Sequence, residues 1–215
     1  MLFRPYLCRG VLEFLMPVPE QMGRQILDLA RAFVRRSLGV DDALPPFDAE
    51  ALRQPAGCFV SLHTLQGRLR GCVGRIDASQ PLLEALESAS EQVLQDPRFA
   101  EAPVRAEELA WLEIEVSVLS PPRPAPHPLA FEPLTEGIYL TFGKRSGCFL
   151  PQVARETGWT REQLLDRLCT EKMGLPASTW RHAQAQLHVF SVDVIGPEPF
   201  ETSIHGQIGK HPIDG

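Results

Sequence analysis

An α+β fold with a mainly antiparallel sheet is predicted from the order of the elements in this 215-residue sequence. The patterns run helix, hairpin, helix, strand, hairpin, short helix, helix and strand. This order lacks the regular strand–helix alternation that is typical of a parallel sheet. A hydrophobic content of 44% with 22% charged residues is ordinary for a globular chain, and the length suits one large or two small domains.

The first half of the chain is predicted to form a helix, a hairpin, a second helix and a strand. Apolar residues recur at the 3.6-residue period over 19–38, and the hairpin covers 57–76. The second helix follows Ser79 and ends before Pro97, because proline disfavours helical geometry in the residue that precedes it. Apolar and polar side chains alternate over 111–119, which is the clearest strand of the sequence.

The second half begins with a proline-rich connector over 121–128, which we expect to be extended. Thr160 and Gln163 fit a capping box, in which each side chain satisfies a free backbone N–H at the start of a helix. The predicted elements are, in order, strands over 137–142 and 148–150, a short helix over 151–156, a helix over 160–173 and a strand over 186–195.

The hairpin over 57–76 makes the sharpest structural prediction. A two-residue turn at Gln66-Gly67 would pair Ser61 with Cys72 and His63 with Arg70. Alternate pairs share a face, so one face is expected to be apolar, with Val60, Leu62, Thr64, Leu69 and Val73. The other face is expected to carry a hydroxyl, an imidazole, a guanidinium and a thiol, from Ser61, His63, Arg70 and Cys72.

The run Leu69-Arg70-Gly71-Cys72-Val73-Gly74 is similar to the signature hexapeptide of the AMMECR family. This is the AMME syndrome candidate gene family, also called AmmeMemoRadiSam system protein A. Further blocks that resemble the family follow in order at 96–99, 112–119, 147–154 and 168–169. The resemblance implies a barrel-like sheet flanked by helices, arranged as two subdomains or a duplicated strand-and-helix unit. It divides the chain into an N-terminal extension (1–18), the AMMECR domain (19–197) and a C-terminal tail (198–215).

Cys72 is the residue on which the chemical hypotheses centre. A nucleophilic or ligand thiolate at Cys72 would be stabilised by Arg70 and Arg68, and His63 would act as its base. The candidate catalytic residues are Cys72, His63 and Arg70. Arg68 is a candidate ligand-binding residue. The alternative is an inert cysteine packed within a glycine-rich strand.

The neighbouring residues carry a second, ligand-binding interpretation. Gly71 and Gly74 would let another group approach the backbone closely, and Ser61 would add a hydroxyl. Arg70 is either an anchor for a phosphate or carboxylate or the ion-pair partner of a nearby glutamate. The two candidate glutamates are Glu113 and Glu115, which lie on one strand face as an acid/base pair or as a solvated surface.

Charge and cysteine usage narrow the classes of function. The net charge of −6 and the presence of only two tyrosines argue against nucleic-acid binding. Five cysteines without C-x-x-C spacing read as reduced thiols of a cytoplasmic protein, and no pair of histidines or cysteines has the spacing of a structural zinc site. No cofactor or metal is therefore expected. The apolar N-terminal stretch is interrupted by Arg9 and Glu13 and does not read as a membrane span.

Two functional hypotheses remain open from the sequence, and nucleic-acid binding is a third, weaker alternative. The resemblance implies a component of a system that includes a radical-SAM protein and a Memo protein. The chain itself lacks the C-x-x-x-C-x-x-C cluster motif, so it is not the radical enzyme. It would act on, carry or position a small-molecule substrate at Cys72, or it would be a non-catalytic module that binds a protein partner.

Overall fold

The computed structural model describes residues 17–41 and 43–200. Six short helical turns, over 51–53, 93–95, 97–99, 106–111, 168–172 and 177–181, connect the main elements. The helices are α1 (Glu20–Ser37), α2 (Leu82–Gln92), α3 (Pro151–Thr157) and α4 (Arg161–Arg167). The strands are β1 (Gly57–Thr64), β2 (Leu69–Arg75), β3 (Leu112–Leu119), β4 (Arg123–Pro124), β5 (Glu136–Phe142), β6 (Arg145–Phe149) and β7 (Gln186–Pro199).

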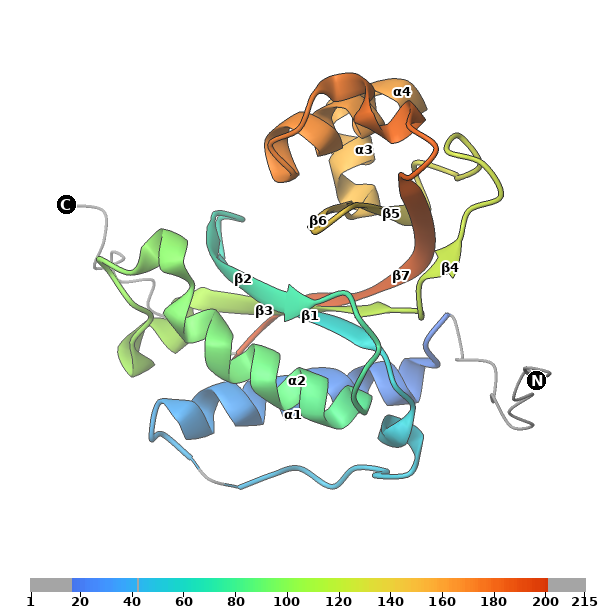
Figure 1. Ribbon diagram of the computed structural model, residues 1–215. Coiled ribbons are helices and arrows are strands. Elements are labelled where there is room, and N and C mark those ends of the chain that lie inside the picture. Colours follow the sequence, from blue (N-terminus) through green and yellow to red (C-terminus); the bar gives the residue numbers. More distant parts are fainter. Residues whose placement is uncertain (1–16, 42, 201–215) are drawn as a thin grey trace.

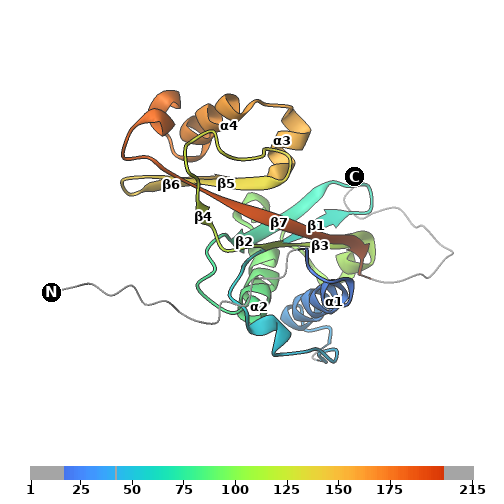
Figure 2. The same ribbon diagram turned by 90° about the vertical axis from the view of Figure 1, so that its right-hand side faces the viewer.

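The strands form one antiparallel sheet that curls into a half-barrel, which confirms the predicted α+β class (Figure 1). The strand order is β2-β1-β3-β7-β5-β6, and β4 pairs with β7 beside this path. The long strand β7 causes the curl, because its first part pairs with β5 and its second part with β3. Helices α1 and α2 cover one outer side, and α3 and α4 cover the opposite side (Figure 2).

The same arrangement of a hairpin, one or two helices and a returning strand occurs twice in the chain. In the first unit β1 and β2 form a hairpin, a helix follows, and β3 returns to pair with β1. In the second unit β5 and β6 form a hairpin, two helices follow, and β7 returns to pair with β5. Pairing of β3 with β7 joins the two units, and leaves β2 and β6 as the two edge strands. The duplication therefore lies in the topology, although the sequence shows no evident repeat.

Each unit has its own hydrophobic core, on the face of the sheet that its helices cover. The first core includes Ile26 and Phe33 of α1 together with Val60, Ile114 and Val116 of the strands. The second is formed by α3, α4 and the turns after α4 with the strands β5, β6 and β7; its strand members are Ile138, Leu140, Phe149, Leu187 and Val189. Because side chains alternate along a strand, the residues between these core positions point to the inside of the half-barrel.

The hairpin register agrees with the prediction at three pairs and differs near the turn. Ser61 pairs with Cys72, as predicted, but His63 pairs with Leu69 rather than with Arg70. The loop has three residues instead of two: Thr64 N–H donates to the Arg68 carbonyl oxygen at 2.8 Å. Gly67 in this loop has a positive φ of 80°, which a glycine adopts without strain. Arg70 is consequently an extra, bulged residue, and the expectation that it shares a face with Cys72 is wrong.

The chain ends of the folded region also differ from the predicted boundaries. Strand β7 continues to Pro199, and Phe200 is buried in the first core, with its N–H 3.1 Å from the Leu112 carbonyl oxygen. The first residues assigned to the C-terminal tail thus belong to the fold. The predicted N-terminal extension and C-terminal tail otherwise consist of residues 1–16 and 201–215, which lie outside the described residues. Within the described ranges, each helix is too short or too polar to cross a membrane.

Candidate functional site

The predicted polar residues gather on the inner face of the first unit. Cys72 of β2, Ser61 of β1 and Glu115 of β3 are successive pairing partners and form one row across three strands. His63 pairs with Glu113 in the next row, on the same face. The neighbours of Ser61 in sequence belong to the helix-covered core, so this row points to the inside of the half-barrel. Five of the nine predicted residues are therefore brought together.

The pairing geometry places the Cys72 side chain close to that of Ser61. The N–H of Cys72 donates to Asp96 and its carbonyl oxygen accepts from Arg98, so both backbone groups point away from β1. Ser61 and Cys72 are consequently a non-hydrogen-bonded pair, in which the Cα atoms are about 4.5 Å apart and the side chains are closest. Cys72 is half-buried and its thiol is free.

Asp96 and Arg98 hold the backbone of Cys72 from outside the sheet. The Asp96 Oδ2 atom lies 2.9 Å from the Cys72 nitrogen, and the Arg98 guanidinium lies 3.0 Å from the Cys72 carbonyl oxygen. Arg98 also bonds Asp96 at 2.6 Å and interacts with the Cys72 side chain itself. The two residues occupy hydrogen-bonding positions that an additional strand would otherwise take, and so they cover the edge of β2 at Cys72.

Sequence reasoning missed this contact. From the sequence, the run Asp96-Pro97-Arg98-Phe99 is predicted only to end a helix, and its one functional signal is its place among the family blocks. Nothing in the local pattern reveals that a side chain 24 residues away meets the Cys72 backbone. The guanidinium beside the thiol is thus that of Arg98, whereas the sequence pointed to Arg70 and Arg68.

We expect the Asp96 contacts to appear in the pH dependence of stability. Hydrogen bonds from Arg98 are the largest cause that lowers the pKa of this carboxyl group, with the Cys72 N–H adding to the effect. A lowered folded-state pKa contributes stability above the unfolded pKa of about 4, and this contribution is lost as the pH falls below that value. Urea unfolding measured from pH 7 to pH 2 should show a shallower decline for Asp96→Asn than for the wild type. Glu91→Gln, at an exposed carboxyl group of α2, is the control, and parallel wild-type and Asp96→Asn curves would contradict the assignment.

Arg70 lies elsewhere and is held by other partners. Its side chain is 8% exposed and binds both carboxylate oxygens of Glu108, at 3.0 and 3.2 Å. It also donates to the Ala102 carbonyl oxygen at 2.5 Å, and its guanidinium lies 5.7 Å from the centre of the Phe99 ring. The expected glutamate partner of Arg70 was Glu113 or Glu115, and the observed partner is Glu108. A guanidinium bound in this way has little capacity to hold an anion from solution.

The two glycines of the hexapeptide are in close contact with the protein itself. A Cβ atom at Gly71 would lie 2.7 Å from the Val93 carbonyl oxygen, on the side of the helices. A Cβ atom at Gly74 would lie 2.7 Å from the Phe59 ring, on the inner side. Packing within the chain therefore requires both glycines, whatever else binds nearby. Arg68 is exposed in the hairpin loop, away from the Cys72 row.

Glu115 is the carboxyl group with the environment of an acid or base. Burial raises its pKa, and the nearby His63 partly offsets this effect by favouring the carboxylate. The Nδ1 atom of His63 is buried and has no hydrogen-bond partner within the described part of the chain. A half-buried carboxyl group with a raised pKa beside an imidazole is an arrangement that suits proton transfer.

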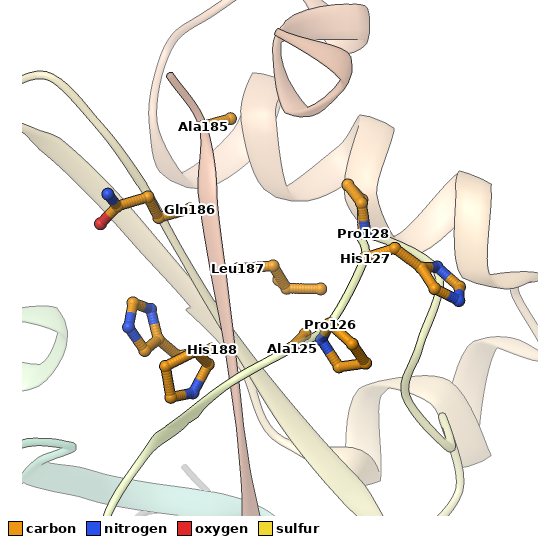
Figure 3. A pocket seen from close by; sticks show the side chains of 9 residues that line it. Ala125, Pro126, His127, Pro128, Ala185, Gln186, Leu187 and His188 are labelled. Atoms are coloured by element: carbon orange, nitrogen blue, oxygen red, sulfur yellow. The ribbon is translucent and has the colours of Figure 1, made fainter. Parts of the chain in front are cut away.

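The other thiols and histidines within 17–41 and 43–200 do not add to this group. Burial raises the pKa of Cys58 and of Cys148 to about 12, and it also raises that of Cys169. A groove of about 380 Å³ lies between the proline-rich connector and the start of β7, and its histidines His127 and His188 point in opposite directions (Figure 3). Across the described residues, no three His, Cys, Asp or Glu side chains are placed to hold a metal ion.

Comparisons with known proteins agree on one family. The AMMECR1 family model matches residues 27–195. A protein of Methanothermobacter thermautotrophicus is 34% identical over 191 residues, which cover 83% of this chain and 95% of that protein. Protein MJ0810 of Methanocaldococcus jannaschii is 35% identical over 173 residues, 77% of this chain and 85% of that protein. The crystal structure of the uncharacterized protein PH0010 from Pyrococcus horikoshii has a TM-score of 0.72 and 33% identity, and the match covers 82% of this chain and 92% of that one.

Proposed function

This chain belongs to the AMMECR1 family, and from that premise we propose that the inner face around Cys72 is a small-molecule site with thiol chemistry. The observation that supports the proposal most directly is the row formed by Cys72, Ser61 and Glu115, with His63 beside it. Cys72 and Glu115 lie on the two strands that flank β1, so two inter-strand distances separate them. Their Cα atoms are therefore about 10 Å apart. One small molecule can contact the thiol and the carboxyl group together, because only the small Ser61 side chain lies between them.

The proposed roles follow from the environment of each group. The Cys72 thiol is the nucleophile or the covalent carrier, and the Arg98 guanidinium lies at the same residue, where it donates to the Cys72 carbonyl oxygen. Glu115, with its pKa raised by burial, exchanges protons with the bound molecule, and His63 supports this exchange. Glu113 and Ser61 contribute polar contacts from the same face, and Arg70 acts indirectly by stabilising the fold.

We further propose that the chain works in the cytoplasm with a radical-SAM protein and a Memo protein. The support for this proposal is the resemblance of the five sequence blocks to AmmeMemoRadiSam system protein A. The sheet does not close into a barrel, because β2 and β6 are edge strands that do not pair with each other, and we expect a partner to deliver a small molecule to the Cys72 row from the inner side. Binding of either partner is expected to change the accessibility of Cys72.

Alkylation by iodoacetamide tests the proposed nucleophile. We expect Cys72 to be labelled first among Cys58, Cys72, Cys148 and Cys169 at pH 7, because burial raises the pKa of the other three thiols. Arg98→Ala should slow the labelling of Cys72 by about threefold to tenfold, because the nearby positive charge is removed. Mass spectrometry of peptides after timed labelling gives the rate for each thiol.

Two controls separate the charge effect from a general disturbance of the fold. Arg53→Ala removes an exposed guanidinium of the first unit that does not line the inner face and should leave the labelling rate unchanged. Arg98→Lys retains a positive charge and should restore part of the rate. Labelling of Cys72 only upon unfolding, or with no dependence on Arg98, would overturn the proposed role of the thiol.

The alternative of a protein-interaction module has one specific observation in its favour. Leu65, in the loop of the β1–β2 hairpin, and Leu69, which pairs with His63, are 43% and 38% exposed. Exposed apolar side chains next to one another are common where another protein binds. If Cys72 is unreactive, this hairpin is the candidate protein-binding surface. Partner capture with the wild type and with Leu65→Ser would then test it, and the variant should capture less of the partner.

A further inference from the structure

A cleft of about 540 Å³ opens between the two units of the half-barrel, beside the Cys72 row. Its volume falls in the range of small-molecule sites. Gly74, two residues after Cys72, and Phe59, two residues before Ser61, line the cleft from the first unit. Because residues two apart on a strand share a face, a ligand in the cleft lies on the same inner surface as Cys72.

Three of the residues that line the cleft carry aromatic rings, and they come from three different strands. Phe59 comes from β1, Tyr139 from β5 and His188 from β7. The rings of Tyr139 and His188 have centroids 6.3 Å apart and are inclined by 50°. All three side chains are partly exposed, so their faces and edges are available to a molecule in the cleft. Aromatic side chains of this kind bind flat rings by stacking or by edge-to-face contact.

Two of the side chains that line the cleft add polar groups. The His188 imidazole is partly exposed, so its ring edge can bond to a ligand group in the cleft. The Tyr139 hydroxyl, on the neighbouring ring, adds a group that can both donate and accept.

The charge at the rim of the cleft is balanced. Arg75 donates to the Asp77 carboxylate at 3.0 Å and to Gln80 at 2.7 Å. A hydrogen bond from Ser79 is the largest cause that lowers the pKa of Asp77, so this residue remains a carboxylate at neutral pH. The guanidinium and the carboxylate compensate each other, and the rim has no net charge with which to select an ionic ligand.

We propose that the cleft binds a neutral, planar heterocycle of the nucleobase or nucleoside class, with its ring on Phe59 and Tyr139 and its edge bonded to His188. The inference rests on the proposed function in one respect, because it names the class of substrate that would reach Cys72. Ring stacking supplies most of the affinity, and the imidazole and the phenol select heterocycles that carry donors and acceptors on their edges.

Calorimetric titration of the purified chain with adenosine, guanosine, cytidine and uridine tests the inference, with ribose as the control without a ring. We expect at least one nucleoside to bind and ribose not to bind. Phe59→Leu should weaken the binding about tenfold, in line with the loss of a stacking contact. Tyr139→Phe retains the ring and removes only the hydroxyl, so it provides a mild variant if Phe59→Leu folds poorly. His182→Leu, which removes an imidazole outside the cleft, should bind like the wild type.

A second readout connects the cleft to the thiol. The nucleoside that binds should slow iodoacetamide labelling of Cys72 at saturation, and should do so less in Phe59→Leu. Binding of none of the four nucleosides, or equal binding by the wild type and both cleft variants, would overturn the inference even if Cys72 is reactive. Binding that leaves the labelling rate unchanged would overturn the link to Cys72. Adenosine 5′-monophosphate binding over tenfold tighter than adenosine would contradict the neutral character of the ligand.

Discussion

Replacing Arg70 with methionine should lower the free energy of unfolding by about 3–5 kcal/mol, because it leaves the buried carboxylate of Glu108 without its partner. The two side chains are only 8% and 12% exposed, and Arg70 binds both oxygens of the carboxylate. Urea denaturation of the wild type and the variant at pH 7 measures the difference. Arg24→Met, at a surface ion pair whose side chains are 72% and 89% exposed, should change stability by less than about 1 kcal/mol.

A double variant distinguishes the ion pair from packing. Glu108→Gln alone removes the negative charge and leaves Arg70 buried, and should also be strongly destabilising. The double variant, Arg70→Met with Glu108→Gln, should lower the free energy of unfolding by less than the sum of the two single variants. In the double variant both charged groups are replaced, so no isolated charge remains buried. A loss of less than about 1 kcal/mol in Arg70→Met would contradict the structural role and reopen the hypothesis that Arg70 binds an anion.

The Arg70→Met variant also separates two roles that the sequence analysis assigned to Arg70, which are the ion pair with a glutamate and the interaction with Cys72. Arg70 lies in the bulge of β2 and contacts Glu108, whereas Arg98 interacts with Cys72. In conditions where Arg70→Met remains folded, its Cys72 labelling rate should therefore equal that of the wild type. This outcome would contrast with the slower labelling expected of Arg98→Ala.

Gly71→Ala should destabilise the fold by about 1–3 kcal/mol, since the added methyl group would enter a space that is already filled. The new Cβ atom would lie 2.7 Å from the carbonyl oxygen of Val93 and 3.1 Å from its Cγ2 atom. The carbonyl oxygen is backbone, so relief requires that β2 and the turn at Val93 move apart. Thermal or urea unfolding of the variant measures the cost.

Gly23→Ala provides the matched control for this prediction. Gly23 lies in α1, and its added Cβ atom would meet only Ile195 side-chain atoms at 3.5 Å or more, which is ordinary contact. Alanine is favoured over glycine in a helix by about 1 kcal/mol, so this variant should be neutral or more stable. If Gly71→Ala were as stable as Gly23→Ala, the glycine would serve a ligand rather than the packing of β2.

The candidate site was predicted in part because strand geometry connects sequence to space by simple rules. Side chains two residues apart on a strand share a face, and this placed Ser61 with His63 and Glu113 with Glu115. The pair Ser61–Cys72 also followed from the hairpin pattern. Arg70 was misplaced because the choice between a two-residue and a three-residue loop depends on the turn conformation at Gly67, which the residue types left open.

The sequence by itself determined the fold class, the main helices and strands, the family and the pairing of Ser61 with Cys72, because periodicity and local pairing are short-range properties. Only the tertiary structure decided which groups meet across long separations. Asp96 and Arg98 reach Cys72, Glu108 reaches Arg70, and Phe59 reaches the cleft shared with Tyr139. These contacts depend on how two strand-and-helix units curl around β7, and that arrangement is set by the packing of two separate cores rather than by any local pattern.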